Sequence, residues 1–570
     1  MADLESRLLG NLQSTMQQMA DPFGMLEACW RVQKAWMTHP QALTEQLREL
    51  HAGIAMLQVQ VQRRMAGLDG EDVIPPVPYD ERFQEPVWRD NPCFDNLKEV
   101  YLLYTRWLED AIYASPGVSC HEREKAGFLT RQVLNALAPS NFFWTNPAAM
   151  LRFLQTGGMS LVDGAVNYLK DLRRGTIRMA DDTEFEVGRN LATTPGAIVY
   201  RNELFELIQY APATETVHEV PIVLVSPWIN KYYVLDLDEK KSLIRYLVAQ
   251  GFTVFVTSWK NPTREMRDTT LDDYMLKGVL QALDVARSIA NSHLVHLAGY
   301  CIGGTIVAAL MAWLNNGGEE DGDQPVSAWS LFTTLVDFEH PGEIAVFIDE
   351  RTIENLESRM ASQGYLDGQD MAGSFRALRS NPLVWHYFIN NYLLGEDPPK
   401  LDVLFWNMDT TRMPEAMHSF YLREFYLHNR LIERDGVELG GRGIDLRRIR
   451  QPLYAVGAEQ DHIAPWQETF KIGALVSGPV RYVLATSGHI FGVINPPVQP
   501  PKRRYWAADL DSGIDALTWR DATSKVPGSW WEDWITWLRP KCGAMAAPPQ
   551  LGSEAYPVLG DAPGSYVLER

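Results

Sequence analysis

The first part of the chain follows a helical pattern of apolar and polar positions. The run at 43–65, LTEQLRELHAGIAMLQVQVQRRM, is apolar on one face and polar on the other. Residues 96–175 continue in this way, whereas the proline-rich VIPPVPYD at 73–80 predicts a linker. We therefore expect a mostly helical N-terminal domain over residues 1–190. Its amphipathic run is more typical of a helix that packs on protein than of one that binds an apolar surface.

From about residue 197 the pattern changes to short apolar runs that alternate with helical stretches. A continuous apolar run such as VPIVLVSPW is typical of a strand buried on both faces of a parallel sheet. The alternation predicts an α/β domain over residues 191–570 with right-handed crossovers. Helices are predicted at 240–250, 272–291 and 302–315, and strands at 197–201, 204–212, 220–228, 253–259, 294–300 and 330–338.

Two later segments depart from this alternation. Residues 340–445 are helical and rich in loops and aromatic side chains, and they predict a cap inserted over the active end of the sheet. The tail after about residue 545 is rich in Pro, Gly and Ala, which predicts a mobile segment. Between them, strands are predicted at 452–461 and 480–489 and a helix at 529–538.

Charge and cysteine content narrow the possible functions. A formal net charge of −20 makes the chain a poor electrostatic partner for nucleic acid. The five cysteines are sparse and form no CxxC pair, so neither a disulfide framework nor a metal site is predicted. The chain starts without the features of a signal peptide, and no apolar run reaches the roughly 18 residues of a membrane span. We expect a cytoplasmic protein without a transmembrane segment.

The motif LAGYCIGGT at 297–305 places Cys301 between a predicted strand and a predicted helix. It is similar to the G-x-S-x-G turn that carries the nucleophile of α/β-hydrolases, with cysteine in place of serine. Asp461 and His489 follow two later predicted strands, so the chain order is nucleophile, acid, histidine, as in that fold. We expect Cys301, Asp461 and His489 to form the catalytic triad of an α/β-hydrolase fold with a helical N-terminal domain.

Each part of this motif has a predicted task. Gly299 and Gly303 let the turn close without Cβ clashes, and the helix that follows favours the thiolate. His489 takes the thiol proton, while Asp461 holds the imidazole in the useful tautomer. His462 competes for the role of base, but its position beside Asp461 makes the needed orientation hard to reach, so we expect it only to support the site.

Five other residues complete the candidate site. The backbone N–H of Ile302 is expected to bind the oxyanion, with a second donor from the loop near Trp228 or Ile229. Asp236 either contacts the site or starts a helix. Trp406, in the predicted cap, either lines a substrate channel or packs the cap, and we favour packing.

A thiol nucleophile suits acyl transfer from a thioester. The exchange of one thioester for another is close to balanced in free energy, so the acyl group stays activated for a second transfer. Hydrolysis must then be suppressed by a covered, water-poor site, which the aromatic cap would provide. The pattern therefore favours a transferase that uses coenzyme A thioesters as substrates and needs no cofactor.

Longer phrases identify the chain as similar to a known family, the polyhydroxyalkanoate synthases. The resemblance extends from about residue 90 to 535 and rests on FEVGRNLATTPGAIVYRNELFELIQY, INKYYVLDL, FTVFVTSWKNP, GYCIGGT, FTTLVDFEHPGEI, FWNMDTTRMP, DHIAPW and SGHIFGVINPP. It implies that (R)-3-hydroxyacyl-CoA monomers are joined into a polyester with release of CoA, through a thioester on Cys301. His489 then matches the family's general base, and Asp461 the acid that helps to activate the 3-hydroxyl group.

The resemblance also implies partners and location. Members of the family act as homodimers on the surface of polyhydroxyalkanoate granules. The single long chain resembles the class I type, which needs no partner subunit and favours short monomers such as 3-hydroxybutyryl-CoA, although class II enzymes of similar length prefer longer ones. The helical N-terminal domain would then serve in granule, partner or dimer contacts. Two alternatives remain: a cysteine hydrolase of the dienelactone-hydrolase type, and a catalytically silent granule scaffold.

Overall fold

The chain divides into two units. The computed structural model describes residues 21–68, 72–76, 80–317, 324–511 and 513–570. One unit comprises Met1–Asp182 and Gly373–Leu401, and the other Thr183–Ala372 and Asp402–Arg570. The first boundary falls after Asp182, and our prediction placed it at residue 190. Residues 373–401, which we expected in the cap, instead group with the helical unit.

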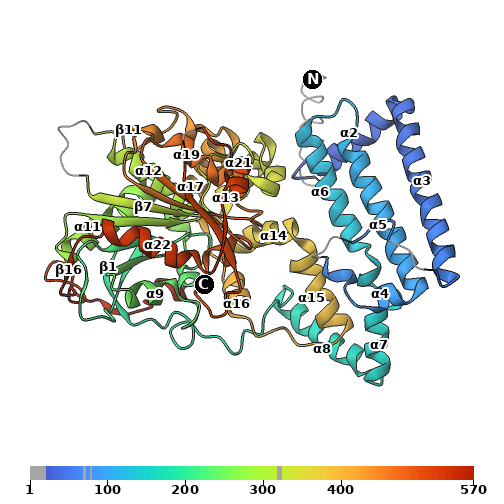
Figure 1. The fold of residues 1–570 in the computed structure, drawn as a ribbon, viewed down its shortest axis with the longest axis horizontal. Helices are drawn as coiled ribbons and strands as arrows, with labels where there is room; N and C mark the ends of the chain where they lie inside the picture. Colours follow the sequence, from blue (N-terminus) through green and yellow to red (C-terminus); the bar gives the residue numbers. More distant parts are fainter. Residues whose placement is uncertain (1–20, 69–71, 77–79, 318–323, 512) are drawn as a thin grey trace, which may run out of the picture. The chain divides into compact units, whose positions relative to one another are not determined.

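The first unit is helical, as its pattern predicts. Asn91 caps α5 and is followed by proline at the first helical position, and Ser119 and Glu122 form a capping box at the start of α6. The inserted segment adds η9 (Asn381–Trp385), α15 (His386–Phe388) and η10 (Ile389–Leu393). The other helices, several of them labelled in Figure 1, are α2 (Met25–Thr38), α3 (Pro40–Met65), α4 (Val87–Asp90), α5 (Pro92–Tyr113), α6 (Cys120–Ala136), α7 (Pro147–Gln155) and α8 (Met159–Arg174).

The second unit is built on one large sheet. Its central strands β5, β4, β6, β7, β12 and β13 are parallel, and the strands on either side of them are antiparallel. Within the described residues the order across the sheet is β15 (Lys525–Pro527), β14 (Arg504–Asp509), β13 (Val480–Ala485), β12 (Leu453–Ala458), β7 (Val326–Phe332), β6 (Val295–Tyr300), β4 (Ile222–Val225), β5 (Val254–Trp259), β2 (Phe205–Tyr210), β1 (Gly196–Arg201) and β17 (Gly560–Asp561).

Alternate side chains of the central strands enter two apolar cores. In β4, Val223 and Val225 face the core formed with α11 (Gln281–Ala290) and α12 (Ile302–Leu314). Ile222 and Leu224 face the core formed with α9 (Leu243–Ala249) and α22 (Trp530–Leu538). Figure 1 shows α22 and α9 alongside the sheet. Because both faces are covered, the central strands read as continuous apolar runs.

The remaining segments extend this frame. Residues between β7 and β12 supply α13 (Glu350–Gln363), α16 (Asp402–Met408), α17 (Glu415–Phe420) and the π-helical η11 (Tyr421–Leu427), and α14 (Gly368–Leu378) spans the boundary between the two units. Short strand pairs join β8 (Tyr365–Leu366) to β9 (Met413–Pro414) and β10 (Glu438–Leu439) to β11 (Arg442–Gly443). Other helices of the unit include α10 (Leu271–Asp273), η6 (Tyr274–Leu280), α18 (Trp466–Phe470), α19 (Ile472–Leu475), α20 (His489–Val493) and α21 (Ala516–Ala522).

The tail after residue 545 is not a loose segment, which corrects the expectation of mobility. Its strand β16 (Met545–Ala546) pairs with β3 (Val217–His218), and β17 pairs with β1. Glu206 of β2 accepts hydrogen bonds from the backbone N–H groups of Ser565 and Tyr566. Composition alone suggested mobility, but backbone pairing to strands more than three hundred residues earlier in the chain fixes this segment.

Candidate active site

Cys301 lies in the sharp turn between β6 and α12. Its backbone has φ 54° and ψ −127°, a conformation that a residue with a side chain rarely adopts. A Cβ atom on Gly299 would come within 2.4 Å of Gly304 Cα, and one on Gly303 within 2.5 Å of the Val225 carbonyl oxygen. The two flanking glycines are therefore required by close backbone approach, as the motif predicted.

The strained turn is held by hydrogen bonds from the neighbouring strand. The N–H of Cys301 donates to the carbonyl of Phe332, the last residue of β7, over 2.9 Å. The carbonyl of Cys301 accepts from the N–H of Gly304 at 2.9 Å and from the hydroxyl of Thr334 at 3.2 Å. Both sides of the cysteine are thus anchored, so the turn keeps its unusual conformation without help from substrate.

The predicted acid and base lie together in the structure. Nδ1 of His489, at the start of α20, is 2.6 Å from Oδ2 of Asp461. Oδ1 of Asp461 accepts from the N–H groups of Ile463 at 2.8 Å and Ala464 at 2.9 Å. The ring of Tyr300 stacks on the imidazole with a centroid distance of 5.6 Å. The carboxylate is therefore fixed from three sides and orients the imidazole through Nδ1.

The electrostatics of His489 connect it to the nucleophile. Burial lowers the pKa of His489, but the charges of Asp461 and Cys301, and hydrogen bonds to both, outweigh burial and raise the pKa to about 10. Because Nδ1 is bonded to Asp461, Nε2 is the nitrogen left to serve Cys301. The arrangement favours a positively charged imidazole beside Cys301, and such an imidazole can hold and return the proton of a cysteine nucleophile.

The loop after β4 lies against the start of α12, where the predicted oxyanion donors would meet. As the first residue of α12, Ile302 has an N–H group with no acceptor inside the helix. Trp228 is buried, its ring packs on Trp259 and Tyr274, and its carbonyl accepts from the hydroxyl of Thr411. Ile229, the next residue, is partly buried against the same core. The loop is therefore fixed in place by the core below and the cap above.

The end of the chain fastens the same loop. Lys231 is 3% exposed and donates to the carbonyls of Glu569 at 2.8 Å and Tyr566 at 3.3 Å. Burial lowers the pKa of Lys231 to about 8, against the opposing charges of Asp409 and Glu569. Arg570 in turn pairs with Asp409 at 2.7 Å. Residues 566–570 thus form a strap over the loop that follows β4.

Three other predicted residues take up structural positions. Trp406 is buried in the core around α9 and α22, and its indole donates to the carbonyl of Lys231 at 2.7 Å. Asp236 accepts from the hydroxyl groups of Thr194 at 2.6 Å and Ser242 at 2.5 Å, and Ser242 caps α9. His462 is half-buried, and His489 is hydrogen-bonded to Asp461.

Two tyrosines of the cap were not predicted. Burial raises the pKa of Tyr421 and of Tyr426 above the ordinary value, and the charge of Cys301 raises both further. Both belong to η11, a π-helix, a form that is frequent at functional sites. The ring of Phe338 lies 4.7 Å from that of Tyr426 and 6.0 Å from that of Tyr421. The aromatic run around residues 420–426 was the available signal in the sequence, but nothing in it marked which of these residues feel the charge of Cys301.

With this geometry established, comparison with known proteins decides the family. Residues 79–247 match the family model described as "Poly-beta-hydroxybutyrate polymerase (PhaC) N-terminus". The poly(3-hydroxyalkanoate) polymerase of Methylorubrum extorquens is 41% identical over 551 residues, which cover 95% of this chain and 89% of that protein. The chain belongs to the poly(3-hydroxyalkanoate) polymerase family. Members of this family are acyltransferases.

Other members of the polymerase family support the same assignment. The polymerase subunit of Cupriavidus necator is 40% identical over 86% of this chain and 83% of its own length. Among solved structures, a monoacylglycerol lipase from Paleococcus ferrophilus covers 60% of this chain and 100% of its own at 10% identity and a TM-score of 0.32. So distant a likeness carries no weight, and the α/β-hydrolase fold follows from the sheet and the strand-to-helix turn at Cys301.

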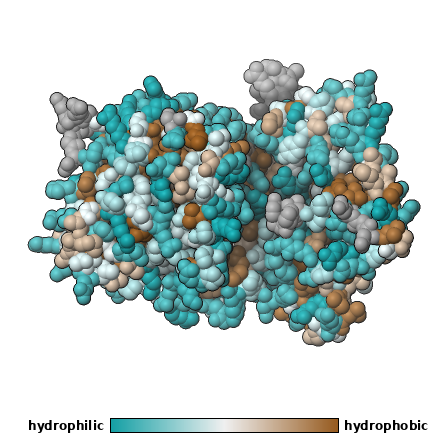
Figure 2. Space-filling view, in the orientation of Figure 1, coloured by the Kyte–Doolittle hydropathy of each residue, from teal (hydrophilic) through white to brown (hydrophobic). Residues whose placement is uncertain are grey.

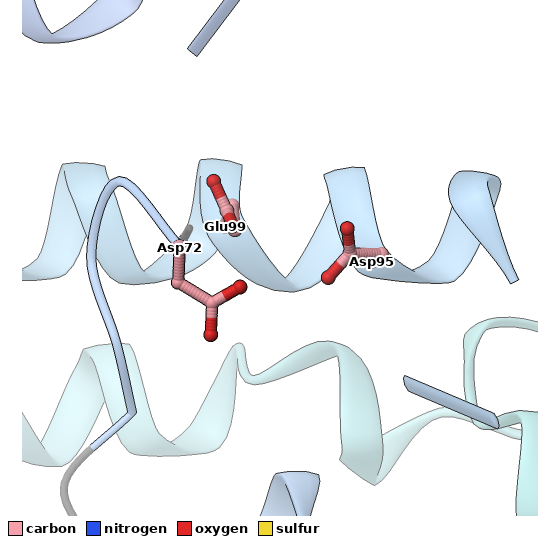
Figure 3. Close-up of side chains that lie close together, drawn as sticks. All are labelled: Asp72, Asp95 and Glu99. Atoms are coloured by element: carbon pink, nitrogen blue, oxygen red, sulfur yellow. The ribbon is translucent and has the colours of Figure 1, made fainter. Parts of the chain in front are cut away.

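A second group of ionisable side chains lies in the helical unit of this polymerase. Asp72, Asp95 and Glu99 bring their carboxylates together, as Figure 3 shows. Arg64 forms ion pairs with all three, and Lys98 binds Asp95 at 2.8 Å. The carboxylates are thus already neutralised in large part by two cations, which makes the group a buried ion-pair network between α3 and α5 rather than a metal site.

Helix length and polarity bear on the expected absence of a membrane span. Across the described ranges, no helix combines the length and the apolar character that crossing a bilayer requires.

Proposed function

We propose that this chain joins (R)-3-hydroxyacyl-CoA monomers into a polyester through a thioester on Cys301. The observation that carries the proposal is the short hydrogen bond between His489 and Asp461, next to a cysteine held in a strained turn. The family assignment sets aside a dienelactone-hydrolase activity. The relatives that match are named as polymerases of 3-hydroxyalkanoates.

In the first step, the thiolate of Cys301 attacks the thioester carbonyl of the monomer. The bond between the acyl carbon and the CoA sulfur breaks, and CoA leaves as a thiol with a proton from His489. The negative charge that develops on the carbonyl oxygen is stabilised by the N–H of Ile302 and by the loop at Trp228 and Ile229. Each such donor contributes roughly 2.7–4 kcal/mol.

In the second step, the 3-hydroxyl group of another unit attacks the acyl carbon. His489 accepts the hydroxyl proton, an ester bond forms and the sulfur is released for the next cycle. Both carboxylate oxygens of Asp461 are engaged, one by His489 and the other by backbone N–H groups. We therefore assign Asp461 an action on the hydroxyl group through the imidazole rather than by direct contact.

We further propose short monomers such as 3-hydroxybutyryl-CoA, action as a homodimer, and association with polyhydroxyalkanoate granules. The helical unit supports association with granules, because α8 exposes its apolar face and buries its polar one. Its buried face is polar, and its exposed face carries five apolar side chains that are 45–62% exposed: Met159, Val162, Val166, Leu169 and Leu172. Brown patches gather around the helical unit at the lower right of Figure 2.

The polar face of α8 is buried for a structural reason. Asn167 donates to the carbonyl of Glu396 at 3.0 Å, and Asp171 accepts from the hydroxyl of Tyr392 at 2.8 Å. A Cβ on Gly164 would come within 2.1 Å of the Tyr392 carbonyl oxygen. The helix is therefore locked with its apolar stripe outward, and an apolar polyester surface is a fitting occupant of that stripe.

Release of CoA from (R)-3-hydroxybutyryl-CoA, together with analysis of the product, tests the proposal. We expect insoluble polyester from the wild type, and no CoA release from a folded Cys301→Ala variant. Free hydroxy acid as the only product would identify a hydrolase, and no release from short or long monomers would favour a silent scaffold. For the granule contact, Leu169→Glu should reduce sedimentation with granules, whereas Lys170→Glu on the flank of the same helix should not.

A further inference from the structure

A pocket opens beside α20, the helix that begins with His489. Phe491 of α20 and Ile494, which follows α20, contribute to its wall, and Lys502 and Arg503 contribute from the segment just before β14. Lys241, Asn495, Pro496, Val498, Pro501 and Gly528 complete the lining. The pocket is therefore separate from the Cys301 turn but shares an element with the catalytic histidine.

The basic side chains of this pocket differ in how they are neutralised. Lys241 is already paired with Asp402 and with Asp238. Arg503 is half-buried, and in the described part of the chain no carboxylate pairs with it. Its guanidinium donates to the carbonyl of Phe491 and lies 5.2 Å from the centre of that ring. A partly buried guanidinium without a counterion favours binding of an anion.

An unused hydrogen-bond donor points to the same conclusion. Asn495 is 1% exposed, and its side-chain nitrogen has no hydrogen-bond partner among the described residues. Its backbone carbonyl accepts from the hydroxyl of Ser529, which fixes the residue in place. A buried amide donor normally has a partner, because leaving it unpaired is energetically unfavourable. A ligand in the pocket would provide the missing acceptor.

The chemistry of the lining defines the ligand class. Two cationic side chains and an amide donor suit phosphate oxygens, whereas Phe491, Ile494 and Val498 suit a flat apolar group. A nucleotide combines both features. The chain as a whole carries a net charge of −20, so a polyanionic substrate needs a local basic site of this kind.

We propose that this pocket binds the phosphate-bearing nucleotide end of the acyl-CoA substrate, with Arg503 and Asn495 as its main polar contacts. The inference rests on the proposed function, since it assigns the substrate of that reaction. Binding energy gathered here, away from the reacting carbonyl, would hold the thioester end of the substrate at Cys301.

Two substrates separate this role from a structural one. 3-Hydroxybutyryl-CoA carries the nucleotide, whereas 3-hydroxybutyryl-pantetheine has the same thioester and lacks the nucleotide and its phosphates. We expect Arg503→Gln to lower kcat/KM for the CoA thioester about ten- to hundredfold, mainly through KM. For the pantetheine thioester, kcat/KM should stay within about twofold of wild type. Arg504→Gln, which alters the exposed neighbouring arginine of β14, is the matched control and should affect neither substrate.

Further measurements complete the test. Adenosine 3′,5′-bisphosphate should compete with the CoA thioester in the wild type and at least tenfold more weakly in Arg503→Gln, while inorganic phosphate alone should compete poorly. Arg503→Lys, which keeps the charge, should recover part of the loss. Equal losses for both thioesters would show a structural role of Arg503, and no loss for either would place the nucleotide elsewhere. Failure of the wild type to release CoA from the CoA thioester would instead count against the proposed function.

Discussion

Asp461 binds His489 with one carboxylate oxygen and two backbone N–H groups with the other. The pair is therefore a rigid unit whose orientation does not depend on substrate. We expect Asp461→Asn to keep this geometry but to hold the imidazole in the wrong tautomer, with polymerisation lowered by roughly 10²–10⁴-fold. Steady-state CoA release gives the loss, and circular dichroism verifies the fold. If the Asp461→Asn enzyme remained active, the role of the carboxylate would be merely structural.

The two neighbouring histidines give a second prediction. His489→Gln should abolish CoA release almost completely, because the imidazole that serves Cys301 is lost. His462→Gln serves as the matched control, since His462 is adjacent to Asp461 in sequence, whereas His489 forms the hydrogen bond to the Asp461 carboxylate. We expect the control to retain activity within about tenfold of the wild type. The reverse ranking would exchange the roles of the two residues.

The raised pKa of His489 predicts a pH dependence of stability. The pKa is about 10 in the folded protein and about 6.5 in an unfolded chain, so folding favours the protonated imidazole. Its contribution is complete below about pH 6.5 and is lost as the pH rises through 10. The destabilisation caused by His489→Gln should therefore be larger at pH 6 than at pH 10, as measured by urea unfolding. An equal effect at both pH values would contradict the charged pair.

The strap formed by residues 566–570 gives a fourth prediction. Deletion of these residues removes the carbonyls that bind Lys231 and the partner of Asp409, and so loosens the loop near Trp228. We expect a lower melting temperature and a fall in kcat of at least tenfold, with a smaller change in KM. Leu568→Ala, at an exposed position of the strap, is the control and should change neither value. A normal kcat after the deletion would show that the strap does not support the oxyanion site.

Sequence patterns predicted the central sheet well, because strands buried on both faces read as apolar runs. The run at 330–338 was the exception. β7 begins at Val326 and ends at Phe332, and Thr333 turns away with φ 43°. The apolar residues that follow Thr333 enter the core as a loop instead of continuing strand β7. Composition does not distinguish a buried loop from a buried strand. β14, with the sequence RYWAAD, was missed because its burial is one-sided and interrupted.

The candidate site was predictable where strand ends fix it. Cys301, Asp461 and His489 all follow parallel strands, whose carboxyl ends meet at one edge of the sheet. Tyr426 and Lys231 were not predicted, because their positions depend on the cap and on residues at the far end of the chain. Such long-range packing leaves no periodic signal in the sequence.

The two outermost strands of the sheet bear on how this polymerase behaves when many copies crowd together. β17 has two residues and lies between Pro557 and Pro563, and at the opposite end β15 has three, including Lys525 and Pro527. Proline cannot donate to a neighbouring strand, and a short edge with lysine is a poor template for further pairing. The tail that covers β1 thus closes an edge that would otherwise recruit strands from other molecules. Aggregation through sheet edges is prevented at both ends by a few residues that take no part in the chemistry.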